Sequence, residues 1–177
     1  GKRKIQVGIL LFLVALTIRL SFYFIASNKL PPSLQKFVTA DTIFYYDPIA
    51  LEMASGSHTQ ASLLSVTRFT FLGYLSLFYR YLGHWYLPVS VFHCFLGALS
   101  VVFIFLAARI FLEEKIALAV GLVASFHVVL VYWTPFVTTE VAFLLLLSIS
   151  IYLCGLFLKT KKPLYLFSLI VLLSIMP

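Results

Sequence analysis

The chain has 177 residues, of which 62% are hydrophobic and only 11% are charged. Soluble domains carry about 25% charged residues, so this composition excludes a water-soluble globular fold and indicates an integral membrane protein. The net charge of +7 does not indicate nucleic-acid binding, because the Lys and Arg residues stand in short clusters beside apolar runs, where they orient membrane helices.

Four apolar runs approach the roughly 20 residues that a helix needs to cross a bilayer. They cover residues 5–25, 86–112, 116–133 and 141–158. The first run is longer than the core of a signal peptide and has no small-residue cleavage site after it, so we expect it to be retained as a span. A fifth run at 164–177 is shorter and ends with the chain, which indicates a truncated span. Residues 1–177 are therefore predicted to be the N-terminal part of an all-α, polytopic transmembrane helix bundle.

The basic residues predict how the bundle is oriented, because cytoplasmic loops carry an excess of Lys and Arg. One side of the predicted membrane holds Lys2, Arg3, Lys4, Arg109, Lys115, Lys159, Lys161 and Lys162. The other side holds Lys29, Lys36, Arg68 and Arg80, spread along a single long segment. We therefore expect a cytoplasmic N-terminus and an extracytoplasmic segment at residues 26–85, in a cell membrane or the endoplasmic reticulum.

That long first loop is predicted to contain short juxtamembrane helices. Asp47 and Pro48 form a favourable N-cap and first helical position, and Gly56 suits the residue just past a helix end, so a helix is expected at residues 48–55. Residues 63–82 mix aromatic side chains with two arginines, a composition typical of a helix lying in the membrane interface.

Three acidic residues on the outer side are candidates for function. Asp41 stands among apolar and aromatic residues, where a carboxylate is costly unless it is used, although it also fits a helix cap. Asp47 is well explained as an N-cap. Glu140 precedes an unbroken apolar run, so it is either a first-turn acid favoured by the helix dipole or a carboxylate that faces a cavity.

Two arginines are the corresponding cationic candidates. Arg19, near the outer end of the first run, either extends to the interface or pairs with a phosphate or carboxylate. Arg68 stands in an aromatic stretch, where a guanidinium suits two-pronged contact with a lipid phosphate. The histidines and cysteines lack metal-ligand spacing, so no metal site is predicted, and His93 and His127 are expected to be packing donors between helices.

One order of residues goes beyond composition. Arg19-Leu20 is followed by Asp41-Thr-Ile-Phe-Tyr45-Tyr46-Asp47-Pro-Ile-Ala50-Leu-Glu-Met-Ala-Ser-Gly56, then by Arg68, an aromatic stretch around Gly73-Tyr74, and Thr139-Glu140. This order resembles the N-terminal half of the GT-C glycosyltransferases, especially the protein O-mannosyltransferase and aminoarabinose-transferase branch. Thr42 stands where that family has a second acidic residue.

The resemblance implies an enzyme that moves a sugar, with inversion, from a polyprenyl-phosphate donor to a lipid, glycan or protein acceptor at the extracytoplasmic face. Asp41 would be the catalytic base or orient the acceptor. Substrate would be bound by Arg19, Tyr45, Asp47, Arg68 and Glu140. No cofactor is obligatory, although Glu140 is also placed to help hold a divalent metal ion.

Two other classes of function fit a polytopic protein. A transporter is expected to have broken helices and charged residues at membrane depth, whereas the second to fourth runs hold no acid or base deep in the bilayer. A non-catalytic scaffold subunit would use the first loop to dock a partner, and it would tolerate replacement of Asp41 and Glu140.

Overall fold

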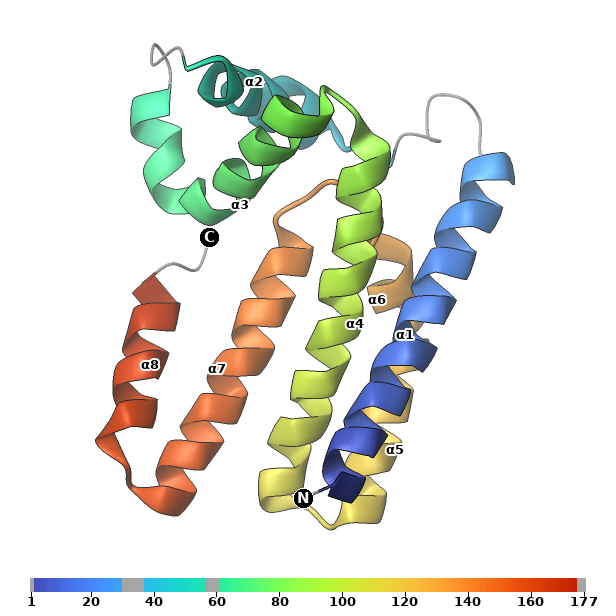
Figure 1. Cartoon of the computed structure of the whole chain (residues 1–177), viewed down its shortest axis with the longest axis vertical. Helices are drawn as coiled ribbons and strands as arrows, with labels where there is room; N and C mark the ends of the chain where they lie inside the picture. Colours follow the sequence, from blue (N-terminus) through green and yellow to red (C-terminus); the bar gives the residue numbers. More distant parts are fainter. Residues whose placement is uncertain (1, 30–36, 57–60, 175–177) are drawn as a thin grey trace.

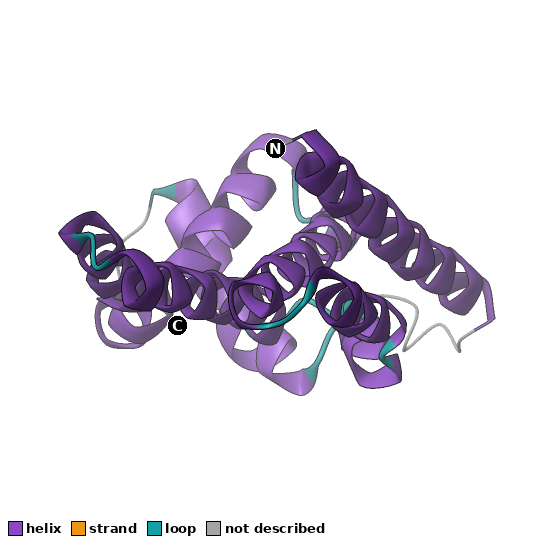
Figure 2. Ribbon diagram, turned by 90° about the horizontal axis from the view of Figure 1, so that it is seen from below, coloured by secondary structure: helices purple, strands orange, loops and turns teal. Residues whose placement is uncertain are grey.

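The computed structural model describes residues 2–29, 37–56 and 61–174, and nearly all of them are helical (Figures 1 and 2). The elements are α1 (Lys2–Lys29), the π-helix η1 (Thr42–Tyr46), α2 (Asp47–Ser55), α3 (Ala61–Leu82), α4 (Tyr86–Phe111), α5 (Glu114–Phe126), α6 (Val128–Trp133), α7 (Glu140–Thr160) and α8 (Pro163–Ser174). The predicted all-α bundle is confirmed. The expectations for Lys36 and for residues 175–177 lie outside the described residues.

Three helices are long and apolar enough to cross a membrane: α1 from Ile5 onward, α4 and α7. They contain 25, 26 and 21 residues, and at about 1.5 Å per residue each is long enough to cross the roughly 30 Å hydrocarbon core. The shorter α8 packs against α7. The chain is therefore an integral membrane protein, as its composition indicated.

The predicted span at 116–133 is not one continuous helix, because the structure divides it into α5 and α6 at His127. The backbone of His127 has φ −62° and ψ 113°, which is extended and ends the first helix. Neither piece reaches spanning length alone, but both pack against α1 (Figure 1). Hydropathy missed this break because His127 stands in an apolar run without Pro or Gly beside it.

Helix α4 is the centre of the bundle, where it packs against α1, α5 and α7. Small residues permit the close approach of α1 and α4, since Ala15 and Ala98 are both fully buried. Small side chains are how membrane helices gain packing contacts without a hydrophobic driving force between them. Within their most apolar windows, 22% of the residues of α1, 44% of α4 and 28% of α7 are buried inside the protein.

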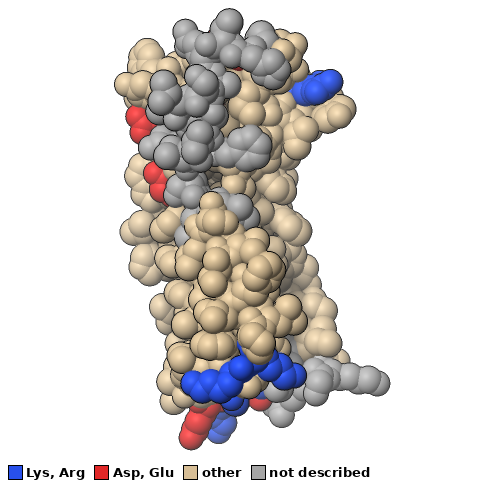
Figure 3. Space-filling model, turned by 90° about the vertical axis from the view of Figure 1, so that its left-hand side faces the viewer, with Lys and Arg blue, Asp and Glu red and all other residues tan. Residues whose placement is uncertain are grey.

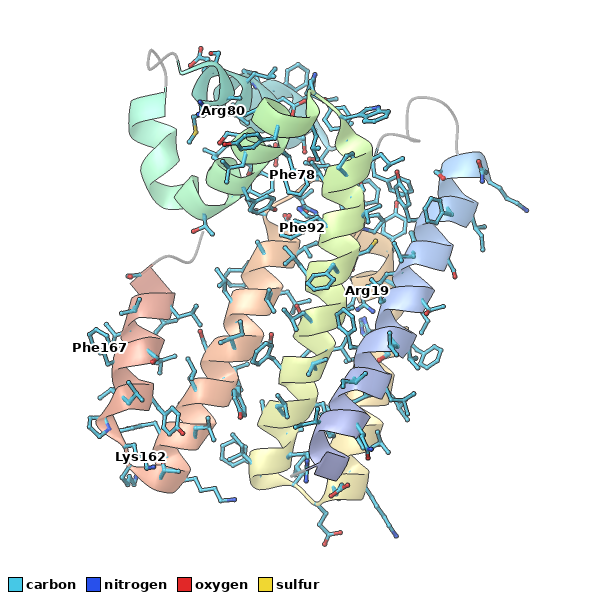
Figure 4. All side chains as sticks on the ribbon, viewed as in Figure 1. Arg19, Phe78, Arg80, Phe92, Lys162 and Phe167 are labelled. Atoms are coloured by element: carbon cyan, nitrogen blue, oxygen red, sulfur yellow. The ribbon has the colours of Figure 1, made fainter. Side chains whose placement is uncertain are left out.

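A helical cap made of η1, α2 and α3 covers one end of the bundle (Figure 1). Its core contains Ile49 and Ala50 from α2 and Phe71, Leu72 and Leu75 from α3, all buried. The cap meets the bundle where Phe78 on α3 faces Phe92 on α4, with ring centroids 5.3 Å apart (Figure 4). The predicted helices in the first loop are confirmed.

The start of α2 differs from the prediction. Asp47 is the first residue of α2 and makes no cap hydrogen bond, because η1 runs directly into α2 and leaves no free N-terminus to cap. Gly56 ends the helix as expected, with a left-handed φ of 78° and its N–H directed to the carbonyls of Glu52 and Met53. The Asp47 side chain is therefore free for another use.

Basic residues gather at the end of the bundle opposite the cap (Figure 3). Arg109 and Lys115 flank the α4–α5 turn, and Lys159, Lys161 and Lys162 flank the α7–α8 turn. Arg109 also forms an ion pair with Glu114 at 3.2 Å. This asymmetry places the acidic cap residues and the basic turns at opposite ends of the membrane-spanning helices.

Candidate active site

A short parallel bridge joins the first loop to the turn between α6 and α7. Val38 pairs with Val137, and the N–H of Val137 donates to the carbonyl of Phe37 at 2.9 Å. The Thr42 hydroxyl donates to the Val137 carbonyl from the other side. Phe37 has a φ of 50°, which is costly for a bulky residue. Two segments about 95 residues apart are thus held together at the cap end.

Asp41 and Glu140 each stand close in sequence to this bridge. Asp41 lies three residues after Val38, and Glu140 lies three residues after Val137. Both side chains are exposed. The bridge therefore holds together the two segments that carry these carboxylates.

A groove opens beside Glu140, between α6 and α7. It has a volume of about 330 Å³. Its other walls are largely apolar, and they include Leu130, Trp133, Thr134, Val141, Leu144 and Leu147. The groove leads from a carboxylate at the cap end down the side of a spanning helix, which is a shape that admits an apolar chain with a polar head.

The π-helix η1 presents aromatic residues next to Asp41. Phe44 and Tyr45 are 72% and 56% exposed, whereas Thr42 and Tyr46 face inward and are buried. Single π-turns are uncommon and are found often at functional sites. Tyr45 lies four residues after Asp41 in the chain, and its ring is exposed.

Asp47 is buried and surrounded by donors that the sequence did not reveal as partners. Its carboxylate accepts hydrogen bonds from the hydroxyls of Tyr79 and Tyr86, and His84 Nε2 lies 3.1 Å from Oδ2. Burial, followed by the hydrogen bond to Asp47, raises the pKa of Tyr79 well above its usual value. The Asp47 carboxylate therefore contacts protein donors on both oxygens.

A second polar connection runs beneath the cap through His93 of α4. Its Nδ1 lies 2.6 Å from the carbonyl oxygen of Phe136, and its Nε2 lies 2.6 Å from the Tyr74 hydroxyl. A carbonyl only accepts, so Nδ1 carries the proton and Nε2 accepts from Tyr74. His93 is the packing donor that the sequence predicted, and it links α3 to the loop before Glu140.

Arg19 does not extend to the membrane interface, which was one of the two alternatives for it. Its side chain is fully buried, between α1 and α4 in Figure 4. Nη1 donates to the carbonyls of Ala15 at 3.1 Å and Ser125 at 3.5 Å, while Nε and Nη2 have no hydrogen-bond partner. Ser125 belongs to the last turn of α5, whose carbonyls lack intrahelical partners. The break at His127 thus creates the acceptor that draws Arg19 inward.

Arg68 lies in α3, and its side chain is not among those described. In the part of the chain that the structure describes, no group of three His, Cys, Asp or Glu side chains is placed to hold a metal ion. The candidate site therefore consists of two exposed carboxylates, an exposed aromatic edge and an adjoining apolar groove.

Comparison with protein families indicates the class of reaction to which the chain is related. The model of the dolichyl-phosphate-mannose-protein mannosyltransferase family matches residues 71–176, which is more than half of the chain. The chain belongs to this family. Comparisons with characterised proteins and with solved structures gave no match. The predicted resemblance is confirmed, and the chain is a membrane protein of a glycosyltransferase family.

The match to the mannosyltransferase family covers α4 to α8 and the second half of α3. It includes Glu140, His93 and the groove between α6 and α7, and it begins after Asp41. The sequence could have pointed to the partners of Asp47, since Tyr79, His84 and Tyr86 fall within eight residues at a helix turn. No sequence pattern predicted that they would converge on a residue of α2.

Proposed function

We propose that the protein transfers a sugar from a polyprenyl-phosphate donor to an acceptor hydroxyl at the extracytoplasmic face of the membrane, with inversion. The observation that carries the proposal is the Val38–Val137 bridge, which holds the segment of Asp41 to the segment of Glu140 in a chain of the mannosyltransferase family. Both carboxylates are exposed, and Glu140 borders an apolar groove.

In this proposal Asp41 is the base. Its exposed carboxylate removes the proton of the acceptor hydroxyl as that oxygen attacks C1 of the sugar. The bond from C1 to the phosphate oxygen breaks, and its electron pair leaves with the polyprenyl phosphate. Attack from the face opposite the leaving group inverts C1. Glu140 orients the acceptor, and the Tyr45 ring packs on a sugar or acceptor face.

The leaving phosphate needs positive charge more than it needs a proton. Arg68 is the proposed direct contact, because it lies in the cap helix α3. Arg19 is enclosed by the bundle, so its guanidinium acts from below the site through its charge. The carboxylate of Asp47 accepts hydrogen bonds from the protein itself, so in this proposal Asp47 holds the site in shape and does not bind substrate.

The extracytoplasmic location rests on the distribution of charge. Described basic residues concentrate at the α4–α5 and α7–α8 turns, whereas the cap end carries Lys29 and Arg80. The excess at the turns favours a cytoplasmic position for them, which leaves the cap on the other side.

The direct test is Asp41→Asn in the intact protein, assayed with polyprenyl-phosphate sugar in membrane vesicles. Transfer is expected to fall by at least about 100-fold, because the general base is lost, while expression and membrane insertion stay normal. Glu140→Gln is expected to raise the KM for the acceptor. Normal transfer by both variants would contradict the roles proposed for Asp41 and Glu140, whereas no transfer by the unmodified protein would favour a scaffold that uses the aromatic cap for docking.

A further inference from the structure

Asp47 connects three consecutive parts of the chain that lie above the bundle. Tyr79 stands near the end of α3, His84 in the α3–α4 turn and Tyr86 at the start of α4, and all three reach one carboxylate at the start of α2. The rings also touch, with Tyr79 to His84 at 4.8 Å and His84 to Tyr86 at 5.1 Å. The start of α2 is thereby joined directly to the first turn of a spanning helix.

The position of α2 is transmitted to Asp41. Residues 40–55 are helical without a break, and the N–H of Asp47 bonds to the carbonyl of Thr42. Asp41 therefore stands on a stiff segment with two side-chain attachments, Thr42 to Val137 and Asp47 to its three donors. The second attachment adds directional hydrogen bonds to the packing of Ile49 and Ala50 in the cap core, and together they restrict rotation of the segment about its own axis.

Packing alone does not require a carboxylate here. Asp47 is 5% exposed and is flanked by the apolar core of the cap. Apolar residues in place of a buried charged group are often neutral or stabilising, whereas a network of charge-assisted hydrogen bonds is directional and selects one arrangement. The geometry therefore favours a role for Asp47 in fixing the position of η1 and the start of α2.

We propose that Asp47 is a positioning residue for the transfer reaction: through Tyr79, His84 and Tyr86 it sets the place of the Asp41 carboxylate relative to Glu140. The expected effect on kcat rests on the proposed function. It requires no contact between Asp47 and substrate.

The kinetic test compares Asp47→Asn, Tyr79→Phe and Tyr86→Phe with the matched control Tyr81→Phe, whose side chain is 75% exposed on the same helix as Tyr79. Each of the first three is expected to lower kcat about 10-fold or more with little change in KM, since misplacement of a catalytic group by about 1 Å costs up to 100-fold. Asp47→Glu, which restores a carboxylate, is expected to recover part of kcat. Normal kcat in Asp47→Asn overturns the proposal.

A second measurement does not depend on activity. Spin labels are attached through Phe44→Cys on η1 and Ile116→Cys on α5, both more than half exposed, after Cys94 and Cys154 are replaced by Ala. We expect one narrow distance distribution, which broadens in Asp47→Asn and narrows again in Asp47→Glu. An unchanged width in Asp47→Asn overturns the proposal. If the unmodified protein transfers no sugar, the proposed function fails, and these widths alone decide whether Asp47 positions η1.

Discussion

The hydroxyl of Thr42 donates a hydrogen bond to the carbonyl oxygen of Val137, a residue 95 positions later in the chain. Thr42 is fully buried and also lies 3.0 Å from the Thr39 hydroxyl. The residue that stands in place of the family's second acid is therefore an anchor, which holds the loop of Asp41 against the loop of Glu140.

If Thr42 anchors the two loops, the variant Thr42→Val should be less stable and less active. The variant keeps the shape of the side chain but leaves the Val137 carbonyl without its donor, which costs about 1–3 kcal/mol for a buried group. A lower unfolding temperature and reduced transfer are expected, measured in detergent and in vesicles. Thr42→Ser is the control, because it retains the hydroxyl. Equal behaviour of the two variants would show that the hydrogen bond has no role.

Gly97 is predicted to be intolerant of any side chain. A Cβ there would come within 2.8 Å of Thr134 Cγ2 and 2.9 Å of Arg19 Nε. Overpacking of this kind costs about 1–3 kcal/mol, so Gly97→Ala should lower the unfolding temperature. The matched control is Gly73→Ala in α3, where a Cβ would meet nothing within 4 Å. That substitution should be neutral or stabilising by up to about 1 kcal/mol.

Arg19→Met separates stability from activity. Two nitrogens of the buried guanidinium, Nε and Nη2, have no hydrogen-bond partner. An apolar replacement is therefore expected to keep or raise the unfolding temperature. Transfer should nevertheless fall about 10-fold or more, because positive charge beneath the leaving phosphate is lost. Arg19→Lys, which keeps the charge, should retain more activity. A destabilised variant with normal transfer would assign Arg19 to the fold alone.

Tyr79 is expected to stay un-ionised at alkaline pH. Burial and the hydrogen bond to Asp47 raise its pKa above its ordinary value. Its contribution to stability is therefore complete below about pH 10, the usual pKa of tyrosine in an unfolded chain, and is lost as pH rises beyond that value. The gap in unfolding temperature between the unmodified protein and Tyr79→Phe should thus narrow above about pH 10.

Ultraviolet absorbance provides the direct readout for Tyr79. At about pH 11, above the ordinary tyrosine pKa, Tyr79→Phe should give the same tyrosinate signal as the unmodified protein. A smaller signal from Tyr79→Phe would contradict the expected protection of that hydroxyl.

Composition and local pattern determined the membrane class, the spans at α1, α4 and α7, and the helical nature of the first loop. These features follow from hydropathy, segment length and the Gly56 helix end, which depend on neighbours in sequence. The order of residues also indicated the glycosyltransferase family. Asp41 was recognised as a candidate because a carboxylate among apolar and aromatic residues is costly, and Glu140 because it precedes an unbroken apolar run.

Only the tertiary structure decided what the polar side chains contact. The break at His127, the burial of Arg19 and the convergence of Tyr79, His84 and Tyr86 on Asp47 each depend on residues far apart in the chain. A buried polar group must find partners wherever packing supplies them. Hydropathy measures how apolar a segment is, but it does not say which helix faces it, and the pairing of Val38 with Val137 depends on which segments come together.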